Sequence, residues 1–555
     1  MIHVIISEGL YDTQFLKRYT NAPMLIKPDG TPLTQKDLGQ EGSAYLVFDA
    51  ATSSIKPLGV AADPVLDYEG DVETPSGAIH VKTAFKLLAE RASKYAPDKA
   101  AQITGVPADT IIRVAREFAT RRGVIDDGWY SARNGTDFDM YRAILILNAL
   151  VGNIDKKGGL CFQESANFPN SCTISADKVD TIFGVSLPPI KAKRVDIQKY
   201  PMAVSSFDAL LDTILTGEPY PIKALIIVAT APFHRDVNTE KLKKALQNLE
   251  LIISIDILPQ DHIDWSDYVF PDLMFLERNE IISAPWPLDA ALSFSNKVLD
   301  PPAGVDARHA LWTLLELVRR AWPDKVAQIG YTEKYADYSQ FELFEEQLLN
   351  NILNHIAKTW NISKEMLEME LRTKGYYILK MKEYETKPYK SKLATPTGLV
   401  EIYSLTALKY GLDPLPDWAP PPYGVPSAPN EFYLITGKDQ NISGHFIFTW
   451  NSKYLTERCV WMNPLDAERL GVKDGDVVTL EGRNGFIAKT CIKVTNRIRQ
   501  GVLFAYGFAG GHVSNLIKEP YNFIKEGVNP QWFTTGYIEP VIGVAATNSV
   551  VRVRL

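Results

Sequence analysis

The sequence feature that most constrains the fold is an alternation of strand-like and helix-like segments between residues 224 and 280. Two short apolar runs, residues 224–229 and 251–255, are rich in β-branched side chains and too short to cross a membrane. Between them, residues 238–249 follow a helical period, and residues 268–270 add a third strand-like run. This alternation predicts a parallel sheet with right-handed crossovers.

The loops after the first two predicted strands, residues 230–238 and 256–267, would lie at the carboxyl edge of that sheet, where ligands of open α/β sheets bind. Asp256 follows the second strand, and its carboxylate can accept hydrogen bonds from the ring N–H and amino group of guanine. The pattern alone is equally compatible with an Asp256 that simply ends a strand. The chain lacks a Gly-x-Gly-x-x-Gly run here, so ordinary NAD binding is not supported.

Composition narrows the class of protein. The 555 residues allow roughly three or four domains, and 46% hydrophobic and 23% charged residues are typical of a globular chain. The net charge of −7 argues against a nucleic-acid partner. No apolar run approaches the length of a membrane span, and no basic leader precedes the first apolar residues, so neither a transmembrane segment nor a signal peptide is expected. The four cysteines are far apart and form no C-x-x-C pair, so no zinc site or iron–sulfur cluster is encoded locally.

The chain divides into four predicted parts. Residues 1–122 contain two or three helices and one or two short strands, too few for a complete α/β domain, so this part either packs on the next one or lacks its other half. Residues 123–385 form the predicted α/β domain, with a helix-rich insertion at about residues 331–377 interpreted as a solvated surface element. A Pro-rich linker, residues 386–430, leads to short strands with a single helix in residues 431–555, which predict a closed barrel of about six strands.

The sequence contains none of the common self-contained catalytic motifs: Gly-x-Ser-x-Gly, a Gly-Lys-Ser/Thr phosphate loop and His-Glu-x-x-His are all absent. Four segments nevertheless resemble, in the same order, the molybdopterin oxidoreductases of the dimethyl sulfoxide reductase family. They are residues 150–154 with Gly158 and Gly159, the run Ser266-Asp-Tyr-Val-Phe-Pro271 with Leu276-Glu-Arg278, residues 395–404 (where Leu399 replaces a family lysine), and residues 463–478. Residues 19–23, 443–451 and 506–512 are most similar to catalytic subunits of thiosulfate, polysulfide and tetrathionate reductases.

The resemblance implies a fold and a boundary. It implies a doubly wound parallel α/β sheet of the molybdopterin oxidoreductase type, N-terminally truncated, followed by a six-stranded double-psi-like β-barrel. Members of the family begin with a cysteine-rich segment and a metal-ligand residue, which lie upstream of the helix that resembles Asp12–Phe15 here. The chain is therefore expected to correspond to the C-terminal half to two-thirds of a full subunit, with the iron–sulfur cluster and the metal ligand elsewhere.

The resemblance also implies a cofactor: two molybdopterin guanine dinucleotides that hold molybdenum or tungsten. The residues it implicates are Thr230, Pro232, Asp256 and Asp261 along the sheet edge, Arg133, Asn134 and Gly135 in a loop toward the metal, and Thr436, Lys438, His445, Thr449, Asn451, His512 and Asn529 in the barrel. Taken alone, His445 and His512 are more often structural than functional, and Lys438 is an ordinary surface residue. No catalytic residue and no metal ligand are assigned to this chain.

The function that the resemblance implies is reduction of a sulfur compound (thiosulfate, polysulfide or tetrathionate) in anaerobic respiration. The expected partners are an N-terminal half or iron–sulfur domain on another chain, an iron–sulfur electron-transfer subunit and a membrane anchor subunit. Two alternatives stay open: a non-catalytic subunit of a respiratory complex that keeps the cofactor fold, and a formate-, arsenate- or nitrate-type member of the family. A fragment unable to fold alone is a third hypothesis, because an unfinished sheet exposes edge strands.

Overall fold

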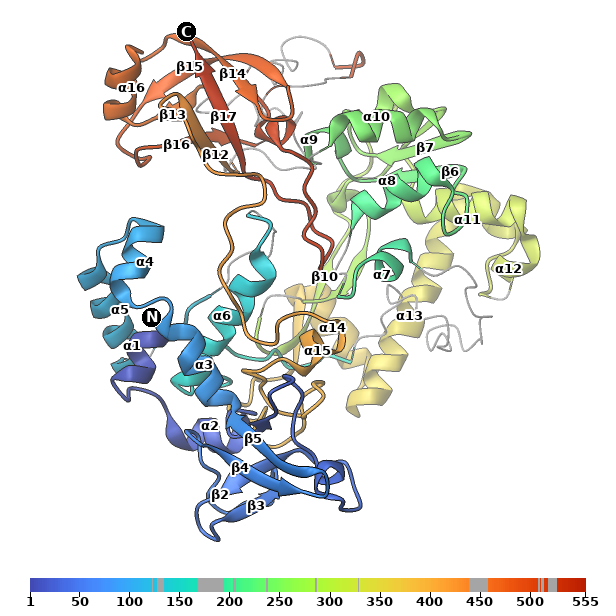
Figure 1. Ribbon diagram of the computed structural model, residues 1–555. Helices are drawn as coiled ribbons and strands as arrows, with labels where there is room; N and C mark the ends of the chain where they lie inside the picture. The colour runs from blue at the N-terminus through green and yellow to red at the C-terminus, as the bar shows by residue number, and fades with distance from the viewer. Residues whose placement is uncertain are drawn as a thin grey trace. The chain divides into compact units, whose positions relative to one another are not determined.

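The chain forms two compact units in a computed structural model (Figure 1). Unit 1 contains Met1–Tyr130, Phe138–Glu164 and Met381–Ala419, and unit 2 contains Ser131–Asp137, Ser165–Lys380 and Pro420–Leu555. The structure describes residues 1–121, 123–126, 134–167, 194–202, 206–235, 238–284, 287–327, 329–438, 458–507, 510, 514–517 and 527–555.

Unit 1 combines helices with small antiparallel sheets. Its helices are α1 (Ile2–Ser7), α2 (Thr13–Tyr19), α3 (Ala84–Ser93), α4 (Pro97–Thr104), α5 (Ala108–Thr120), α6 (Asp137–Leu150, whose first residue is assigned to unit 2) and α15 (Leu405–Lys409). Its strands are β1 (Leu25–Ile26), β2 (Leu46–Asp49), β3 (Ser54–Pro57), β4 (Glu69–Thr74) and β5 (Gly77–Thr83), in the orders β1-β5-β4 and β2-β3. The prediction of one or two short strands in this region is therefore wrong. The polar β4–β5 hairpin was missed because most of its side chains are exposed and give little hydrophobic alternation.

The larger hydrophobic core of unit 1 lies among its helices, and a smaller one lies among its strands. The larger core joins apolar side chains of α1, α2, α3 and α6 to a later segment that includes Val400, Ile402 and Tyr403. Asn21 completes this junction, because its side-chain nitrogen donates to the Tyr403 carbonyl at 2.7 Å and its side-chain oxygen accepts from the Ile402 amide at 2.9 Å. Residues separated by about 380 positions in sequence thus share one interior.

Unit 2 contains the predicted parallel sheet. Strands β6 (Ala224–Val228), β7 (Leu251–Asp256) and β8 (Tyr268–Pro271) pair in that order, and both pairs are parallel. The helices α8 (Phe207–Thr216) and α10 (Thr239–Gln247) share a core with one face of β6 and β7, whereas α11 (Ala310–Ala321) packs on the opposite face of β7 (Figure 1). The strand–helix–strand alternation predicted from residues 224–280 is confirmed for these three strands.

The helix-rich segment predicted at about residues 331–377 contains η4 (Glu333–Ala336), η5 (Tyr338–Gln340), α13 (Phe341–Trp360) and α14 (Lys364–Lys374). Apolar side chains of α13 and α14 bury against β10 (Ala290–Ser295), the central strand of an antiparallel sheet with β9 (Glu280–Ser283) and β11 (Tyr376–Lys380). The interpretation as a solvated surface element is therefore wrong. The segment supplies half of a hydrophobic core.

The C-terminal part of unit 2 is a closed six-stranded barrel in the order β12-β16-β13-β15-β14-β17. The strands are β12 (Glu431–Gly437), β13 (Val460–Met462), β14 (Val477–Gly482), β15 (Ile487–Val494), β16 (Val502–Tyr506) and β17 (Ser549–Arg554), with the helix α16 (Pro464–Leu470) after β13. Apolar side chains from alternating strand positions fill the interior. This confirms the predicted six-stranded barrel, whereas its double-psi connectivity stays a prediction.

The barrel contains a disulfide that sequence spacing did not indicate. Cys459 and Cys491 are joined, with their Cα atoms 4.6 Å apart. The parallel register of β13 and β15 sets Val460 opposite Ile492, so the residues before each lie side by side. A pairing across 32 residues depends on this strand register, which local sequence patterns do not report.

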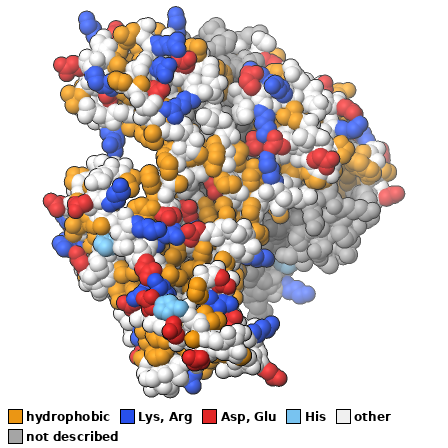
Figure 2. Space-filling model, in the orientation of Figure 1, with side chains coloured by type: hydrophobic (Ala, Val, Ile, Leu, Met, Phe, Trp, Pro, Cys, Tyr) orange, Lys and Arg blue, Asp and Glu red, His pale blue; other side chains and the backbone are white. Residues whose placement is uncertain are grey.

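The remaining described elements of unit 2 are α7 (Val195–Lys199), α9 (Pro232–Arg235), α12 (Pro323–Ala327), η2 (Ile263–Trp265), η3 (Phe275–Glu277) and η8 (Pro530–Phe533). Among the residues whose structure is described, no helix combines the length and apolarity needed to cross a bilayer. Figure 2 shows acidic, basic and histidine side chains side by side over the region of β4, β5 and α3.

Candidate functional site

The carboxyl ends of β6 and β7 form one continuous edge in unit 2. The Ala229 amide, just after β6, donates to the Ile255 carbonyl at 3.1 Å, so the two strand ends stay in register. Ala229 has a positive φ of 50°, an uncommon backbone conformation for a residue with a side chain, and it turns the chain toward Thr230 and α9. A strained residue at a strand end is often part of a ligand site.

Asp256 is the buried acid at this edge. Its side chain is 6% exposed, and Oδ1 accepts from the Ile257 amide at 2.8 Å and more weakly from the Leu258 amide at 3.4 Å. Oδ2 is buried and has no hydrogen-bond partner among the described residues. Burial raises the pKa of Asp256 to about 6, against the opposing effects of these amides, of His262 and of the Gln260 side chain. A carboxylate in this state is poised to accept a donor from a ligand.

The loop after β7 brings more polar groups to the same place. Gln260, Asp261 and His262 are each fully buried. Both ring nitrogens of His262 lack a hydrogen-bond partner within the described part of the chain, although Nδ1 lies 3.6 Å from Asp261 Oδ1. His262 was not predicted from sequence. The available signal was the polar run Gln260-Asp-His262, four residues beyond the end of an apolar strand.

Asp272 connects this edge to α11 on the other side of the sheet. Its amide donates to the Asp256 carbonyl at 3.0 Å, and its Oδ1 accepts from the Ala310 amide at 2.7 Å. Its Oδ2 faces Arg278 Nη1 at 3.4 Å. Asp272 thus fixes the first turn of α11 against the end of β8 and holds the backbone of Asp256 in place.

Segments near the barrel contact both loops of the edge, within unit 2. Trp532 Nε1 donates to the Phe233 carbonyl at 3.1 Å, beside the loop after β6. Ser514 Oγ donates to Asp264 at 2.7 Å, in the loop after β7. These contacts join the C-terminal part of the chain to the sheet edge.

The predicted site residues fall into separate places. Thr230 is half-buried and Pro232 is buried in the loop after β6, next to the end of β7. Thr436 is half-buried and Lys438 is exposed at the end of β12. Asn529 is buried, and its Oδ1 accepts from the Gln531 amide at 3.1 Å as the N-cap of η8. The fold brings Thr230, Pro232, Asp256 and Asp261 to one edge, whereas the barrel residues belong to other elements.

Asn134 and Gly135 lie against residues that flank the barrel. Asn134 Oδ1 accepts from Tyr423 Oη at 3.2 Å and from Asn548 Nδ2 at 3.0 Å. Gly135 has a φ of 76°, and a Cβ there would come within 2.9 Å of the Tyr537 ring. Contacts within the protein therefore account for the asparagine and the glycine at these two positions without a ligand. A cofactor-binding role for Asn134 and Gly135 stays a prediction. Arg133, His445, Thr449, Asn451 and His512 lie outside the described residues.

Comparison with known proteins assigns the chain to a family. Residues 1–318 match the family described as molybdopterin oxidoreductase, and residues 432–550 match the molydopterin dinucleotide binding domain. The chain belongs to the molybdopterin oxidoreductase family. The second match contains the closed barrel from Phe432 to Val550 almost completely.

Relatives within the molybdopterin oxidoreductase family include proteins named for sulfur chemistry. The chain is 29% identical over 470 residues to the thiosulfate reductase molybdopterin-containing subunit PhsA of Salmonella typhimurium, which covers 76% of this chain and 57% of PhsA. It is 27% identical over 443 residues to the probable dimethyl sulfoxide reductase chain YnfF of Escherichia coli, covering 73% of this chain and 51% of YnfF. The chain thus spans between half and three-fifths of these curated relatives.

A solved structure has the same fold. Acetylene hydratase from Pelobacter acetylenicus is similar with a TM-score of 0.66 at 18% identity, and the match covers 100% of this chain and 68% of the hydratase chain. At this identity the similarity concerns the fold only.

The residues of the sheet edge fit a molybdopterin dinucleotide of the guanine type. Guanine presents a ring N–H and an amino group as neighbouring donors, and Asp256 Oδ2 is a buried acceptor with no partner in the described structure. Because Oδ1 already accepts backbone amides, Oδ2 is the oxygen that remains for the base. An unsatisfied buried acceptor costs about 1–3 kcal/mol, which a ligand donor would recover.

Proposed function

We propose that this chain is the C-terminal part of a molybdenum or tungsten oxidoreductase that carries two molybdopterin guanine dinucleotides and reduces a sulfur compound in anaerobic respiration. The observation that carries the proposal is the buried Asp256 carboxyl, whose Oδ2 lacks a partner among the described residues, at the carboxyl edge of the parallel sheet of a molybdopterin oxidoreductase. When bound, the cofactor supplies the redox chemistry, and this chain holds and orients it.

Each group of residues has a distinct role in this proposal. Asp256 accepts hydrogen bonds from guanine, and His262 and Asp261 line the same buried loop. Thr230 and Pro232 shape the neighbouring loop, where Ala229 turns the chain. The barrel residues proposed to contact the dinucleotides are Thr436, Lys438, His445, Thr449, Asn451, His512 and Asn529, together with Arg133, Asn134 and Gly135 from the loop before α6. The Lys438 ammonium can form an ion pair with a phosphate, but it cannot form the bidentate hydrogen bonds that an arginine guanidinium forms.

The substrate class rests on the relatives. Both PhsA and YnfF are named for reduction of sulfur compounds, thiosulfate and dimethyl sulfoxide, which supports a sulfur compound as substrate. PhsA is named as a molybdopterin-containing subunit, which supports action within an assembly. The partners we propose are a chain that carries the N-terminal half or iron–sulfur domain, an iron–sulfur electron-transfer subunit and a membrane anchor subunit.

The test is co-expression of the chain with its neighbouring reading frames under anaerobic conditions, followed by assay with reduced methyl viologen. Oxidation of the viologen is expected with thiosulfate, polysulfide or tetrathionate, and not with nitrate or arsenate. A complex that contains molybdenum or tungsten but oxidises reduced viologen only with nitrate or arsenate, or only reduces oxidised viologen with formate, would contradict the substrate class. A stable complex without metal or pterin would instead favour a non-catalytic subunit.

A further inference from the structure

A pocket in unit 1 shares no residue with the sheet edge of unit 2 and has no role in the function proposed above. Its volume is about 460 Å³, and every lining residue belongs to unit 1. Three stretches that are distant in sequence form it: the end of β1 with the turn after it, the segment from β5 into α3, and the residues on both sides of α15, which include Tyr403 before the helix and Asp413 to Leu415 after it. This volume lies within the range of small-molecule sites in proteins.

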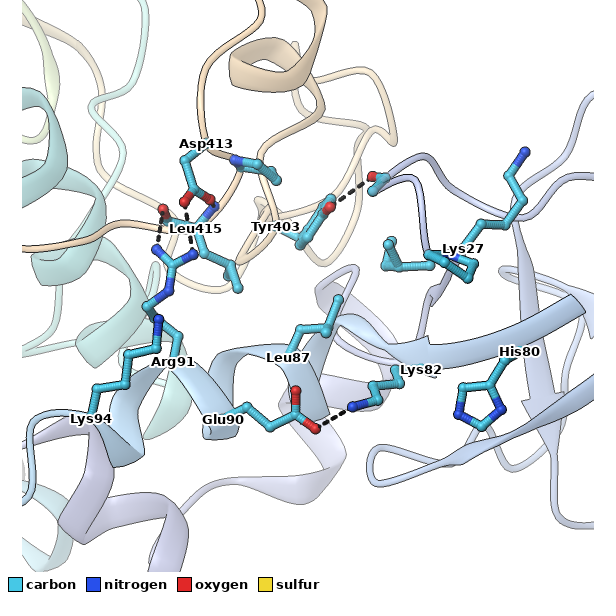
Figure 3. A pocket seen from close by; sticks show the side chains of 14 residues that line it. Lys27, His80, Lys82, Leu87, Glu90, Arg91, Lys94, Tyr403, Asp413 and Leu415 are labelled. Atoms are coloured by element: carbon cyan, nitrogen blue, oxygen red, sulfur yellow. Dashed lines mark hydrogen bonds and ion pairs between the residues drawn. The ribbon is translucent and has the colours of Figure 1, made fainter.

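Hydrogen bonds hold the pocket walls in place. Tyr403 Oη donates to the Gly30 carbonyl at 2.7 Å and joins two of the three stretches. Arg91 of α3 donates to the Leu415 carbonyl at 3.3 Å and to Asp413 Oδ2 at 2.7 Å, which joins the helix to the third wall (Figure 3). The pocket is therefore preformed, and a ligand would not have to order it.

The charges that line the pocket do not balance. Its two carboxylates are both engaged: Glu90 accepts from Lys82 at 2.7 Å, and Asp413 accepts from Arg91. Lys94, the C-cap of α3, is exposed and forms no direct ion pair among the described residues, although its charge acts on Asp417 and helps to lower the pKa of that carboxyl. Figure 3 shows Lys94 beside Arg91 at one end of the pocket. That end thus offers a cation to an incoming anion.

The body of the pocket is apolar. Leu87 points toward Tyr403, and Leu415 lies above it in the close view (Figure 3). Burial raises the pKa of Tyr403 to about 12, so its ring stays neutral. We propose that the pocket binds a small amphipathic carboxylate, whose anionic head pairs with Lys94 and whose apolar body lies between Leu87, Tyr403 and Leu415.

The test uses 2-naphthoate as the probe and 2-naphthalenemethanol as its neutral counterpart, titrated calorimetrically into the full chain at low ionic strength. We expect the carboxylate to bind about two- to fivefold more tightly than the alcohol, because this is the effect on affinity of an ion pair at a protein surface. Lys94→Glu should abolish this preference. Glu90→Gln removes a carboxylate from the pocket wall and leaves Lys82 with Glu69 as its remaining ion-pair partner, so it should strengthen naphthoate binding.

A matched control separates the pocket from overall charge. Lys99 is an exposed lysine of the neighbouring helix α4 and does not line the pocket, so Lys99→Glu makes the same charge change elsewhere. It should leave both affinities unchanged. Equal binding of the two probes, equal effects of Lys94→Glu and Lys99→Glu, or no binding of naphthoate at millimolar concentration would each overturn the proposal. If Lys94 acts only on the helix dipole at the C-terminus of α3, Lys94→Glu should lower the Tm and leave naphthoate binding unchanged. That result would also overturn the proposal.

Discussion

At the scale of single residues, the account depends on a buried carboxyl that is costly without a ligand. Asp256 is nearly inaccessible, and burial raises its pKa to about 6, so at neutral pH the folded chain carries a desolvated charge. Retaining such a group against its cost in stability is typical of a binding site. His262, equally buried with two ring nitrogens that lack partners among the described residues, extends the same argument.

Replacing Asp256 by Asn is expected to separate binding from stability. The amide oxygen keeps the bonds to the Ile257 and Leu258 amides, but the charge that attracts the guanine donors is lost. Loss of charge-assisted hydrogen bonds should weaken guanine nucleotide binding by about 1.5–3 kcal/mol. The Tm at pH 7.5 should stay the same or rise. Asp300→Asn, at an exposed aspartate, is the control and should change neither quantity. A variant that binds nucleotide as the parent does would remove Asp256 from the site.

The pH dependence of nucleotide binding follows from the same carboxyl. Guanine donors favour the ionised form, and the free protein takes up a proton on Asp256 below about pH 6. Affinity for guanosine monophosphate, measured by calorimetry from pH 5 to pH 8, should therefore be constant above pH 7 and fall as the pH drops through 6. The Asn variant should show a flat profile. An equally steep fall in that variant would assign the dependence to another group.

At the scale of secondary-structure elements, the junction of α11 with α13 contains a pair of buried groups that respond oppositely to pH. His309 Nδ1 accepts from the Leu311 amide at 3.0 Å, so its proton lies on Nε2, which faces Glu345 at 3.4 Å. Burial lowers the pKa of His309 to about 4 and raises that of Glu345 to about 7. Glu342, Glu346, Arg278 and Lys297 also act on Glu345, with burial as the largest effect.

Glu345 and His309 contribute to the stability of the folded chain over opposite pH ranges. The folded pKa of Glu345 lies above its ordinary value of 4.5, so the stability linked to its proton is present below pH 4.5 and is lost as the pH rises through 7. His309 acts in reverse, because its contribution is present above its ordinary value of 6.5 and is lost as the pH falls through 4. Glu345→Gln should therefore raise stability at pH 8 by roughly 2 kcal/mol and change it little at pH 5. Thermal unfolding at both pH values tests this, and an equal shift at both would contradict it.

The disulfide of the barrel makes a second prediction at this scale. It closes a loop of 32 residues between β13 and β15. In the chain-entropy view, a loop of this length stabilises the folded state by about 3–4 kcal/mol. Cys491→Ser, or treatment with a reductant, should lower the Tm of the barrel transition by several degrees in calorimetry. Cys161→Ser, at a free cysteine of unit 1, should leave that transition unchanged. Free thiols at both Cys459 and Cys491 in the native protein would contradict the pairing.

At the scale of the whole molecule, local sequence patterns predicted the elements better than their contacts. The three parallel strands and α13 were found because their apolar residues follow a strand-like or helical pattern, and α16 because Asn463 and Gly471 cap its two ends. The β4–β5 hairpin was missed because most of its side chains are exposed and show little hydrophobic alternation. The burial of α13 against β10 was misinterpreted because it depends on partners distant in sequence. The same reason applies at the site, since Asp256 was visible as the end of a strand whereas the burial of His262 was not.

The proposed function makes one claim for the entire molecule, that the sheet edge and the barrel together hold paired dinucleotides around one metal. The direct measurement is acid release of guanine nucleotide and metal analysis on the chain purified with its partner. The account predicts about two guanine nucleotides for each molybdenum or tungsten, and a clear loss of nucleotide in the Asp256→Asn variant. Metal-loaded protein without guanine nucleotide, or a nucleotide content that the Asp256 substitution does not change, would contradict it.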